Sequence, residues 1–357
     1  MMPCTMLGAG RYHEGKPMGE KWTYWFGELG KEANDSVGKK CANLGELTKI
    51  GLRVPPGFAI SVDGYRMFMK ETGAGEEIKE YVRREFGDTK DVAQELEASR
   101  VIRGIIERKE MPSKMKEELI AHYKKLCEDC RLADLSVAVR SSGAVSMPGQ
   151  METYLNVKGA EEMVKKIIQV WGSAFTARAI SFRFQQGLPI DWAPIGVAVL
   201  KMVNAKCAGV VLTVIPTTGD TSKIIIEGNW GLGESVVSGE VNPDSYIVDK
   251  ETLDIERTVA EKTKMVVYSD KGTASVDIPE EKKRLSILVD EEVREIARIC
   301  KQVEEHYGVP QDIEWVIDLD LPFPENLFFV QARPAKSVKK KGNDADYIID
   351  LMTRLFK

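Results

Sequence analysis

Charged amphipathic segments dominate the first half of the chain, whereas β-rich runs dominate the second half. Between residues 75 and 130 apolar residues recur at helical spacing among many charged ones. After residue 190 the sequence changes to three β-branched runs separated by polar turns, PIGVAVLKMV, AGVVLTVIP and KIIIEGNWG. We therefore expect an α+β fold with two lobes, and a cleft between the lobes is the usual place for a small ligand.

Composition and hydrophobic patterning set the expected boundaries of these parts. Residues 1–20 lack periodicity and are expected to form an N-terminal extension, followed by a first lobe over 21–190 and a second, β-rich lobe over 191–337. Residues 338–357 read as a basic linker and a short helix. The apolar stripe of that helix could dock a partner or cap its own domain; it consists of Tyr347, Ile348, Leu351 and Leu355.

The overall charge and apolar pattern argue against several classes of protein. The 357 residues contain 50 lysines and arginines against 55 acidic residues, so there is no basic excess of the kind that binds nucleic acid. No window approaches the roughly 18 to 20 apolar residues of a membrane span, so we expect a cytoplasmic protein. Six cysteines do not form a disulfide scaffold in a chain of this length, and only Cys127 and Cys130 have ligand-like spacing.

Two alternating segments near residue 320 predict a polar hairpin. In QDIEWVIDLD the alternation places Asp312 and Glu314 on one face of a strand, about 7 Å apart. In LFFVQARP it places Phe329, Gln331 and Arg333 on one face of the next strand. If the two strands pair, their polar groups converge. Oxygen ligands suit Mg²⁺ and an arginine suits phosphate, although a solvent-facing polar side would show the same pattern.

Two segments of the first lobe could hold an anion. In SVGKKCANLGEL, Lys39 and Lys40 stand just ahead of a helix, where free backbone N–H groups favour negative charge. In VAVRSSGAVSMPGQMETYLNV, Arg140 emerges at the end of a buried strand and is followed by hydroxyls and glycines. This composition is typical of a phosphate-binding loop, although the Walker A pattern is absent. Gly231-x-Gly233 lacks the third glycine of a dinucleotide fingerprint.

Taken in order, these segments resemble the N-terminal nucleotide-binding domain of the phosphoenolpyruvate synthase and pyruvate phosphate dikinase family. The similarity covers about residues 35 to 337 and is carried by VGKKCANLGELTKIGLRVPPGFAIS, VAVRSSGAVSMPGQMETYLNV, GVAVLKMV, AGVVLTVIP, IEGNWGLGESVVSGEVNPDSYIVDK and DIEWVID with LFFVQARP. The resemblance implies an ATP-grasp-like fold whose two lobes hold ATP in the cleft. It also implies cleavage of ATP to AMP, with transfer of the β and γ phosphates to a histidine on a separate, swivelling domain.

The resemblance also assigns roles to individual residues. It implies that Lys40, Arg140 and Arg333 contact phosphate and that Glu314 and Gln331 bind Mg²⁺. The remaining expected nucleotide contacts are Asp312 beside the metal, Met202 and Val203 along the adenine, and a lid formed by Gly149, Gln150 and Thr153. Two departures matter: Lys39 could compete with Lys40 for its role, and Leu200 stands where many relatives have glutamine.

None of the three histidines, His13, His122 and His306, lies in the Thr-Ser-His context of the family's phosphohistidine. We therefore expect the ATP-cleaving subunit of a split dikinase, which acts on a separate partner subunit that carries the phosphohistidine and acceptor-binding domains. This arrangement looks most like the ATP-binding subunit of phenylphosphate synthase, with phenol or pyruvate as the final acceptor. A stand-alone small-molecule phosphotransferase and a non-catalytic nucleotide sensor remain alternatives.

Overall fold

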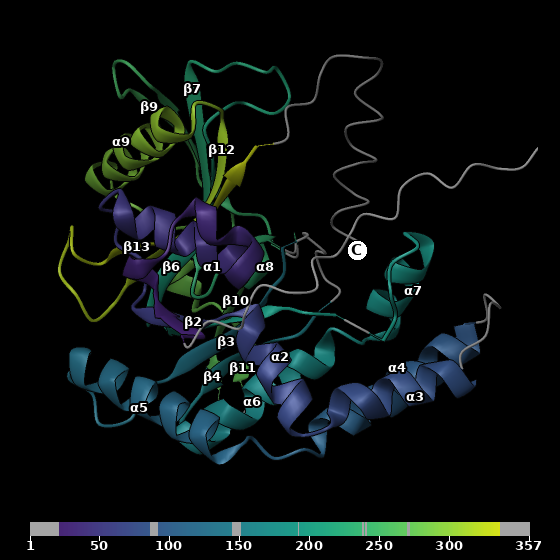
Figure 1. Cartoon of the computed structure of the whole chain (residues 1–357). Coiled ribbons are helices and arrows are strands. Elements are labelled where there is room, and N and C mark those ends of the chain that lie inside the picture. Colours follow the sequence, from purple (N-terminus) through teal and green to yellow (C-terminus); the bar gives the residue numbers. More distant parts are fainter. Residues whose placement is uncertain are drawn as a thin grey trace, which may run out of the picture.

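The computed structural model describes residues 21–85, 92–144, 151–191, 193–237, 239, 241–269 and 272–335. Two β-sheets, each with its own hydrophobic core, form two lobes (Figure 1). The α+β class and the two-lobed arrangement expected from the sequence are thus confirmed. The predicted lid residues Gly149 and Gln150, the extension 1–20 and the helix within 338–357 lie outside the described residues.

The first lobe is built on a five-stranded sheet in which every neighbouring pair is antiparallel. Its order is β1 (Thr23–Trp25), β2 (Gly57–Ile60), β5 (Gly196–Lys201), β3 (Val137–Ser142) and β4 (Thr153–Val157). Amphipathic helices cover one face and bury Phe68, Ile102 and Trp171 in the main core. They are α2 (Val62–Glu71), α3 (Ala74–Glu85), α4 (Val92–Glu107), α5 (Ser113–Asp129), α6 (Ala160–Ser173) and α7 (Ala177–Gln185).

The second lobe is built on a six-stranded antiparallel sheet. Its order is β13 (Leu327–Pro334), β12 (Gln311–Asp318), β6 (Ala205–Leu212), β7 (Lys223–Trp230), β8 (Asp244–Asp249) and β9 (Ile255–Thr258). Helix α9 (Asp290–Tyr307) packs its apolar stripe on one face of this sheet, and the other face carries the polar residues of β12. A short helix, α8 (Glu234–Val237), and a separate hairpin, β10 (Lys264–Ser269) with β11 (Gly272–Asp277), complete the lobe.

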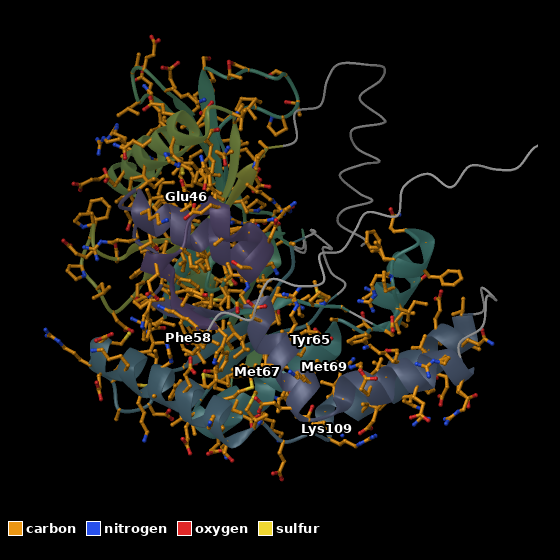
Figure 2. The ribbon with its side chains drawn as sticks, in the orientation of Figure 1. Glu46, Phe58, Tyr65, Met67, Met69 and Lys109 are labelled. Atoms are coloured by element: carbon orange, nitrogen blue, oxygen red, sulfur yellow. The ribbon has the colours of Figure 1, made fainter. Side chains whose placement is uncertain are left out.

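Helix α1 (Asn34–Lys49) joins the two lobes. Its residues Cys41 and Leu44 pack against the first sheet, whereas Leu47 belongs to the core of the second lobe. Glu46, labelled in Figure 2, pairs with His306 of α9, and its Oε1 lies 2.7 Å from the Nε2 of the histidine. The helix is therefore fixed to both sheets.

Strand β5 crosses the boundary that composition predicts. The sequence analysis assigns residues after 190 to the second lobe, but β5 pairs with β2 and β3 of the first sheet. Composition could not reveal this pairing, because it joins segments that are distant in the sequence. The chain passes from the first sheet to the second after Lys201. None of the described helices is long and apolar enough to span a membrane.

Candidate functional site

A break in α1 brings the lysine motif against the end of β3. Gly38 has φ 79° and ψ 163°, so the helical hydrogen-bond pattern is interrupted there. After the break, the Lys39 N–H donates to the Gly143 carbonyl at 3.0 Å. The Cys41 N–H donates to the Ser142 hydroxyl at 3.1 Å. Two hydrogen bonds thus join the lysine motif to the end of the strand that carries Arg140, although the two segments lie about a hundred residues apart in the sequence.

Lys40 lies in a partly buried position among charged groups from both lobes. Burial and then the positive charge of Arg140 lower the pKa of its ammonium group to about 8. The Glu314 carboxylate acts in the opposite direction, and Arg333 contributes a further small lowering of this pKa. Helix α1 packs against both β3 and β13, so the fold places the segment that carries Lys40 between the strands that carry Arg140 and Arg333. Lys39, in contrast, is exposed to solvent, which favours Lys40 as the phosphate contact.

Arg140 lies in the middle of the first sheet, opposite Ala198 on β5 and Thr153 on β4. It shares a strand face with Ala138, which packs in the same cluster as α1, so its side chain points toward α1. Its Nε atom is buried and has no hydrogen-bond partner among the described residues. A buried guanidinium donor without a partner is unusual, and an anion bound beside it would satisfy it.

The predicted polar hairpin is present in β12 and β13. Glu314 lies opposite Gln331, and Asp312 lies opposite Arg333, whose Nε and Nη2 contact Asp312 Oδ2 at 2.9 and 2.8 Å. One detail of the prediction is wrong: Phe329 does not share a face with Gln331. A β-bulge between Glu314 and Trp315 shifts the register and turns Phe329 into the core beside α9.

The segment between β5 and β6, which we call the hinge, carries Met202 and Val203. Val203 packs with Ala208, Val316 and Phe328 into a small apolar cluster on the Glu314 face of the second sheet. Met202 packs on the first-lobe cluster around α1, so the two residues contact different lobes. This apolar surface beside the charged groups suits a nucleotide base.

A hydrogen bond that the sequence analysis did not anticipate involves the same hinge. The Tyr268 hydroxyl, on β10, donates to the Val203 carbonyl. No local sequence signal points to this contact, because it joins a hairpin to a segment more than sixty residues away.

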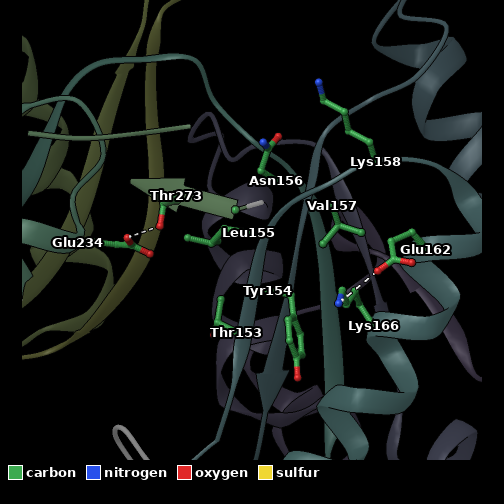
Figure 3. Close-up of a pocket in the computed structure, with 11 residues that line it drawn as sticks. Thr153, Tyr154, Leu155, Asn156, Val157, Lys158, Glu162, Lys166, Glu234 and Thr273 are labelled. Carbon is green, nitrogen blue, oxygen red and sulfur yellow. Dashed lines mark hydrogen bonds and ion pairs between the residues drawn. The ribbon is translucent and has the colours of Figure 1, made fainter. Parts of the chain in front are cut away.

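A cavity of about 760 Å³ lies beside the charged cluster, between edge strand β4 and the β11 hairpin. Thr153 and Leu155 line it from the first lobe, and Glu234 and Thr273 line it from the second (Figure 3). The Asn156 side chain also bridges the lobes by donating to the Ser269 carbonyl at 2.6 Å. Lys40 and Glu314 do not line this cavity, so it does not contain the charged cluster.

The two metal ligands implied by the family resemblance, Glu314 and Gln331, lie on paired strands and would form only part of a metal site. Glu314 and Gln331 face each other across one rung of the ladder, which offers one carboxylate and one amide oxygen. Within the described residues, no three His, Cys, Asp or Glu side chains lie close enough together to hold a metal ion. This pair fits Mg²⁺, which commonly takes one or two protein oxygens and completes its shell with water and phosphate.

Sequence reasoning missed three residues near the charged cluster. They are Ser142, whose hydroxyl accepts from Cys41; Tyr268 at the hinge; and Glu227, a partly buried carboxylate on the polar face of the second sheet. The alternation of residues in KIIIEGNW could have placed Glu227 on the other face of the strand from the core residues Ile224 and Ile226. The other two required knowledge of long-range contacts.

Comparisons with known proteins identify relatives of this chain. The chain is 42% identical over 328 residues to a probable phosphoenolpyruvate synthase from Methanocaldococcus jannaschii, covering 90% of this chain and 27% of that protein. It is 37% identical over 354 residues to the phosphoenolpyruvate synthase of Aeropyrum pernix, covering 90% and 43%. The chain thus spans between about a quarter and a half of these relatives.

A solved L-amino acid ligase from Bacillus licheniformis matches with a TM-score of 0.21 and 12% identity, over 75% of this chain and 56% of that chain. The model of the AMP/ATP-binding domain of pyruvate phosphate dikinase matches residues 34–350. The charged cluster, the hinge and the hairpin all fall within that match. The chain therefore belongs to the family of the pyruvate phosphate dikinase AMP/ATP-binding domain.

Proposed function

We propose that this chain binds MgATP in the cleft between its lobes and cleaves it to AMP, transferring the β and γ phosphates together to a histidine. Lys40, Arg140 and Arg333 would hold the phosphates, and Glu314 and Gln331 would hold Mg²⁺, with Asp312 orienting Arg333. Met202 and Val203 would contact the adenine, and Thr153 would approach the phosphates from β4. The finer assignments of Gly149 and Gln150 rest on the family resemblance.

The observation that carries this proposal is the packing of α1 against both β3 and β13, which brings the segments carrying Lys40, Arg140, Arg333 and Glu314 to the junction of the lobes. Three cations at this junction repel one another, and in the free protein Glu314 and Asp312, which pairs with Arg333, offset only part of their charge. A triphosphate with its magnesium ion would neutralise this excess. Phosphoryl transfer depends mainly on such charge neutralisation and on positioning.

Magnesium, when bound, would neutralise phosphate charge and so make the phosphorus more open to attack. The chain's own residues would do the rest. Lys40 and Arg140 approach from the first lobe and Arg333 from the second, so a bound triphosphate would be held from two sides. This arrangement fixes the direction from which a nucleophile can attack.

The acceptor is expected to lie outside the described residues. His122 stacks on Trp25 and its Nδ1 lies 2.9 Å from the Glu118 carbonyl, whereas His306 pairs with Glu46. Both histidines therefore have structural roles. We place the acceptor histidine on a further domain or on a partner subunit, as in the split arrangement, and the relatives named phosphoenolpyruvate synthase favour pyruvate over phenol as the final acceptor.

Labelled nucleotide tests this function. The chain is incubated with Mg²⁺ and ATP labelled at either the β or the γ phosphate, together with a phosphohistidine domain from a phosphoenolpyruvate synthase. Both labels should appear on the histidine while AMP accumulates. Transfer of the γ label alone, with ADP as the product, would indicate a simple kinase, and binding without any transfer would indicate a nucleotide sensor.

A further inference from the structure

Glu227 lies on the same face of the second sheet as the proposed metal ligands. Along β7, Ile224 and Ile226 enter the core beside α9, so Glu227 points to the opposite face. The ladder places Glu227 opposite Val210, and Val210 lies opposite Glu314. Because neighbouring strands are about 4.8 Å apart, the Glu227 backbone lies about 10 Å from that of Glu314.

Glu227 is a partly buried carboxylate and differs from the fully buried ones in having no partner. The four carboxylates that are most buried each lie beside a cation: Glu46 beside His306, Asp244 beside Lys262, Glu292 beside Lys206 and Asp318 beside Lys201. Within the described part of the chain, no hydrogen bond or ion pair involves the Glu227 carboxylate, and burial raises its pKa. Even a partly buried carboxylate without a partner lowers stability, which points to a role in binding or catalysis.

Arg333 and Glu227 lie on opposite sides of Glu314. Helix α1, which carries Lys40, packs against β13, and Arg333 belongs to β13 itself, whereas Glu227 lies two strands from Glu314 in the other direction. Among the described residues, Glu227 does not belong to any group of three or more His, Cys, Asp or Glu side chains that could hold one metal ion. The Glu314 and Glu227 backbones are about 10 Å apart with Val210 between them, so a phosphate group and a planar ring held by the two carboxylates would lie above Val210.

We propose that Glu227 orients the attacking imidazole by accepting a hydrogen bond from its ring N–H. This inference rests on the proposed function. The other ring nitrogen uses its lone pair to form an N–P bond to the β phosphorus. The bond between that phosphorus and the oxygen bridging to the α phosphate breaks, and its electron pair leaves with AMP. The ring becomes cationic, and the Glu227 carboxylate stabilises this charge or takes the ring proton.

Free imidazole serves as the acceptor in the test. AMP formation from MgATP is measured with the full chain, with Glu227→Gln and Glu227→Ala, and with Glu256→Gln as a matched control on an exposed residue of the same sheet. Glu227→Gln should lower the imidazole-dependent rate about 100-fold. Its Kd for MgATP should stay within about twofold of the wild-type value, and the control should change neither quantity.

Chemical rescue separates a direct role from a structural one. Formate should restore much of the imidazole-dependent rate to Glu227→Ala but not to Glu314→Ala, because only the first variant lacks a carboxylate beside the imidazole. An unchanged rate in Glu227→Gln would overturn the inference, as would a Kd for MgATP weakened about tenfold, which would make Glu227 a nucleotide or metal ligand. Wild-type protein that forms no AMP would instead contradict the proposed function, and the inference would fall with it.

Discussion

Gly38 packs directly against the backbone of Ser142, and a Cβ atom at position 38 would overlap the Ser142 carbonyl group. Its φ of 79° lies in the region that favours glycine. We predict that Gly38→Ala separates Lys40 from Arg140, lowers the free energy of unfolding by about 2 kcal/mol or more and weakens MgATP binding at least about tenfold. Denaturant unfolding and calorimetric titration measure the two effects.

Gly51 provides the matched control for this variant. It also has a positive φ, 86°, but nothing lies within 4 Å of the position that its Cβ would occupy. Gly51→Ala should therefore lower the free energy of unfolding only through backbone strain and leave the affinity for MgATP unchanged. Equal loss of affinity in both variants would contradict a specific role for the contact between Gly38 and Ser142.

Lys40 is expected to lower the free energy of unfolding, although MgATP binding requires it. Its pKa is about 8 in the folded chain and about 10.5 when unfolded, so the charged form is less favourable in the folded state. At pH 7 Lys40→Met should raise the free energy of unfolding by about 1 to 2 kcal/mol and abolish MgATP binding. Lys39→Met, at the exposed neighbouring position, should change neither quantity. A destabilised Lys40→Met protein would contradict this account.

The same pKa predicts how nucleotide affinity depends on pH. Below pH 8 Lys40 carries its charge in the free protein, whereas above pH 8 it must take up a proton before it can hold phosphate. The affinity for MgATP should therefore fall as the pH rises from 8 to 10, by at most about tenfold per pH unit. Calorimetric titrations across this range, with Lys40→Arg as a variant whose charge persists, measure the effect. A wild-type affinity that stays constant to pH 10 would exclude Lys40 from the site.

Asn43 connects α1 to the second lobe through two hydrogen bonds. Its Oδ1 accepts from the Ala332 N–H at 2.7 Å, and its Nδ2 donates to the Tyr307 hydroxyl at 3.2 Å. Asn43→Ala leaves a backbone donor of β13 without its partner and should lower the free energy of unfolding by about 1 to 3 kcal/mol. Asn34→Ala on the same helix, where the side chain donates a hydrogen bond to neighbouring Asp35, is the control. Thermal unfolding that does not distinguish the two variants would count against a bridging role for α1.

The polar hairpin could be predicted from the sequence because its pattern is local. Alternation fixed the faces of Asp312, Glu314, Gln331 and Arg333, and a short connection made antiparallel pairing the natural arrangement. Phe329 was placed on the wrong face because three successive apolar residues, Phe328 to Val330, give no alternation that would reveal the bulge.

Other features of the site depend on contacts between distant segments. The placement of β5 in the first sheet, the packing of Gly38 on Ser142 and the isolation of Glu227 all require knowledge of which strands and helices are neighbours. A single sequence shows that Lys40 and Arg140 are suited to phosphate, but only the fold shows that they meet Glu314.

If both lobes together hold MgATP at the charged cluster, Arg140→Ala should remove most of the binding. Calorimetric titration of MgATP into the wild-type chain and into this variant gives the two values of Kd, with circular dichroism showing that the variant is folded. The account predicts saturable binding by the wild-type chain and a Kd raised about 100-fold or more in Arg140→Ala. A folded Arg140→Ala protein that binds MgATP within about twofold of the wild-type affinity would contradict it.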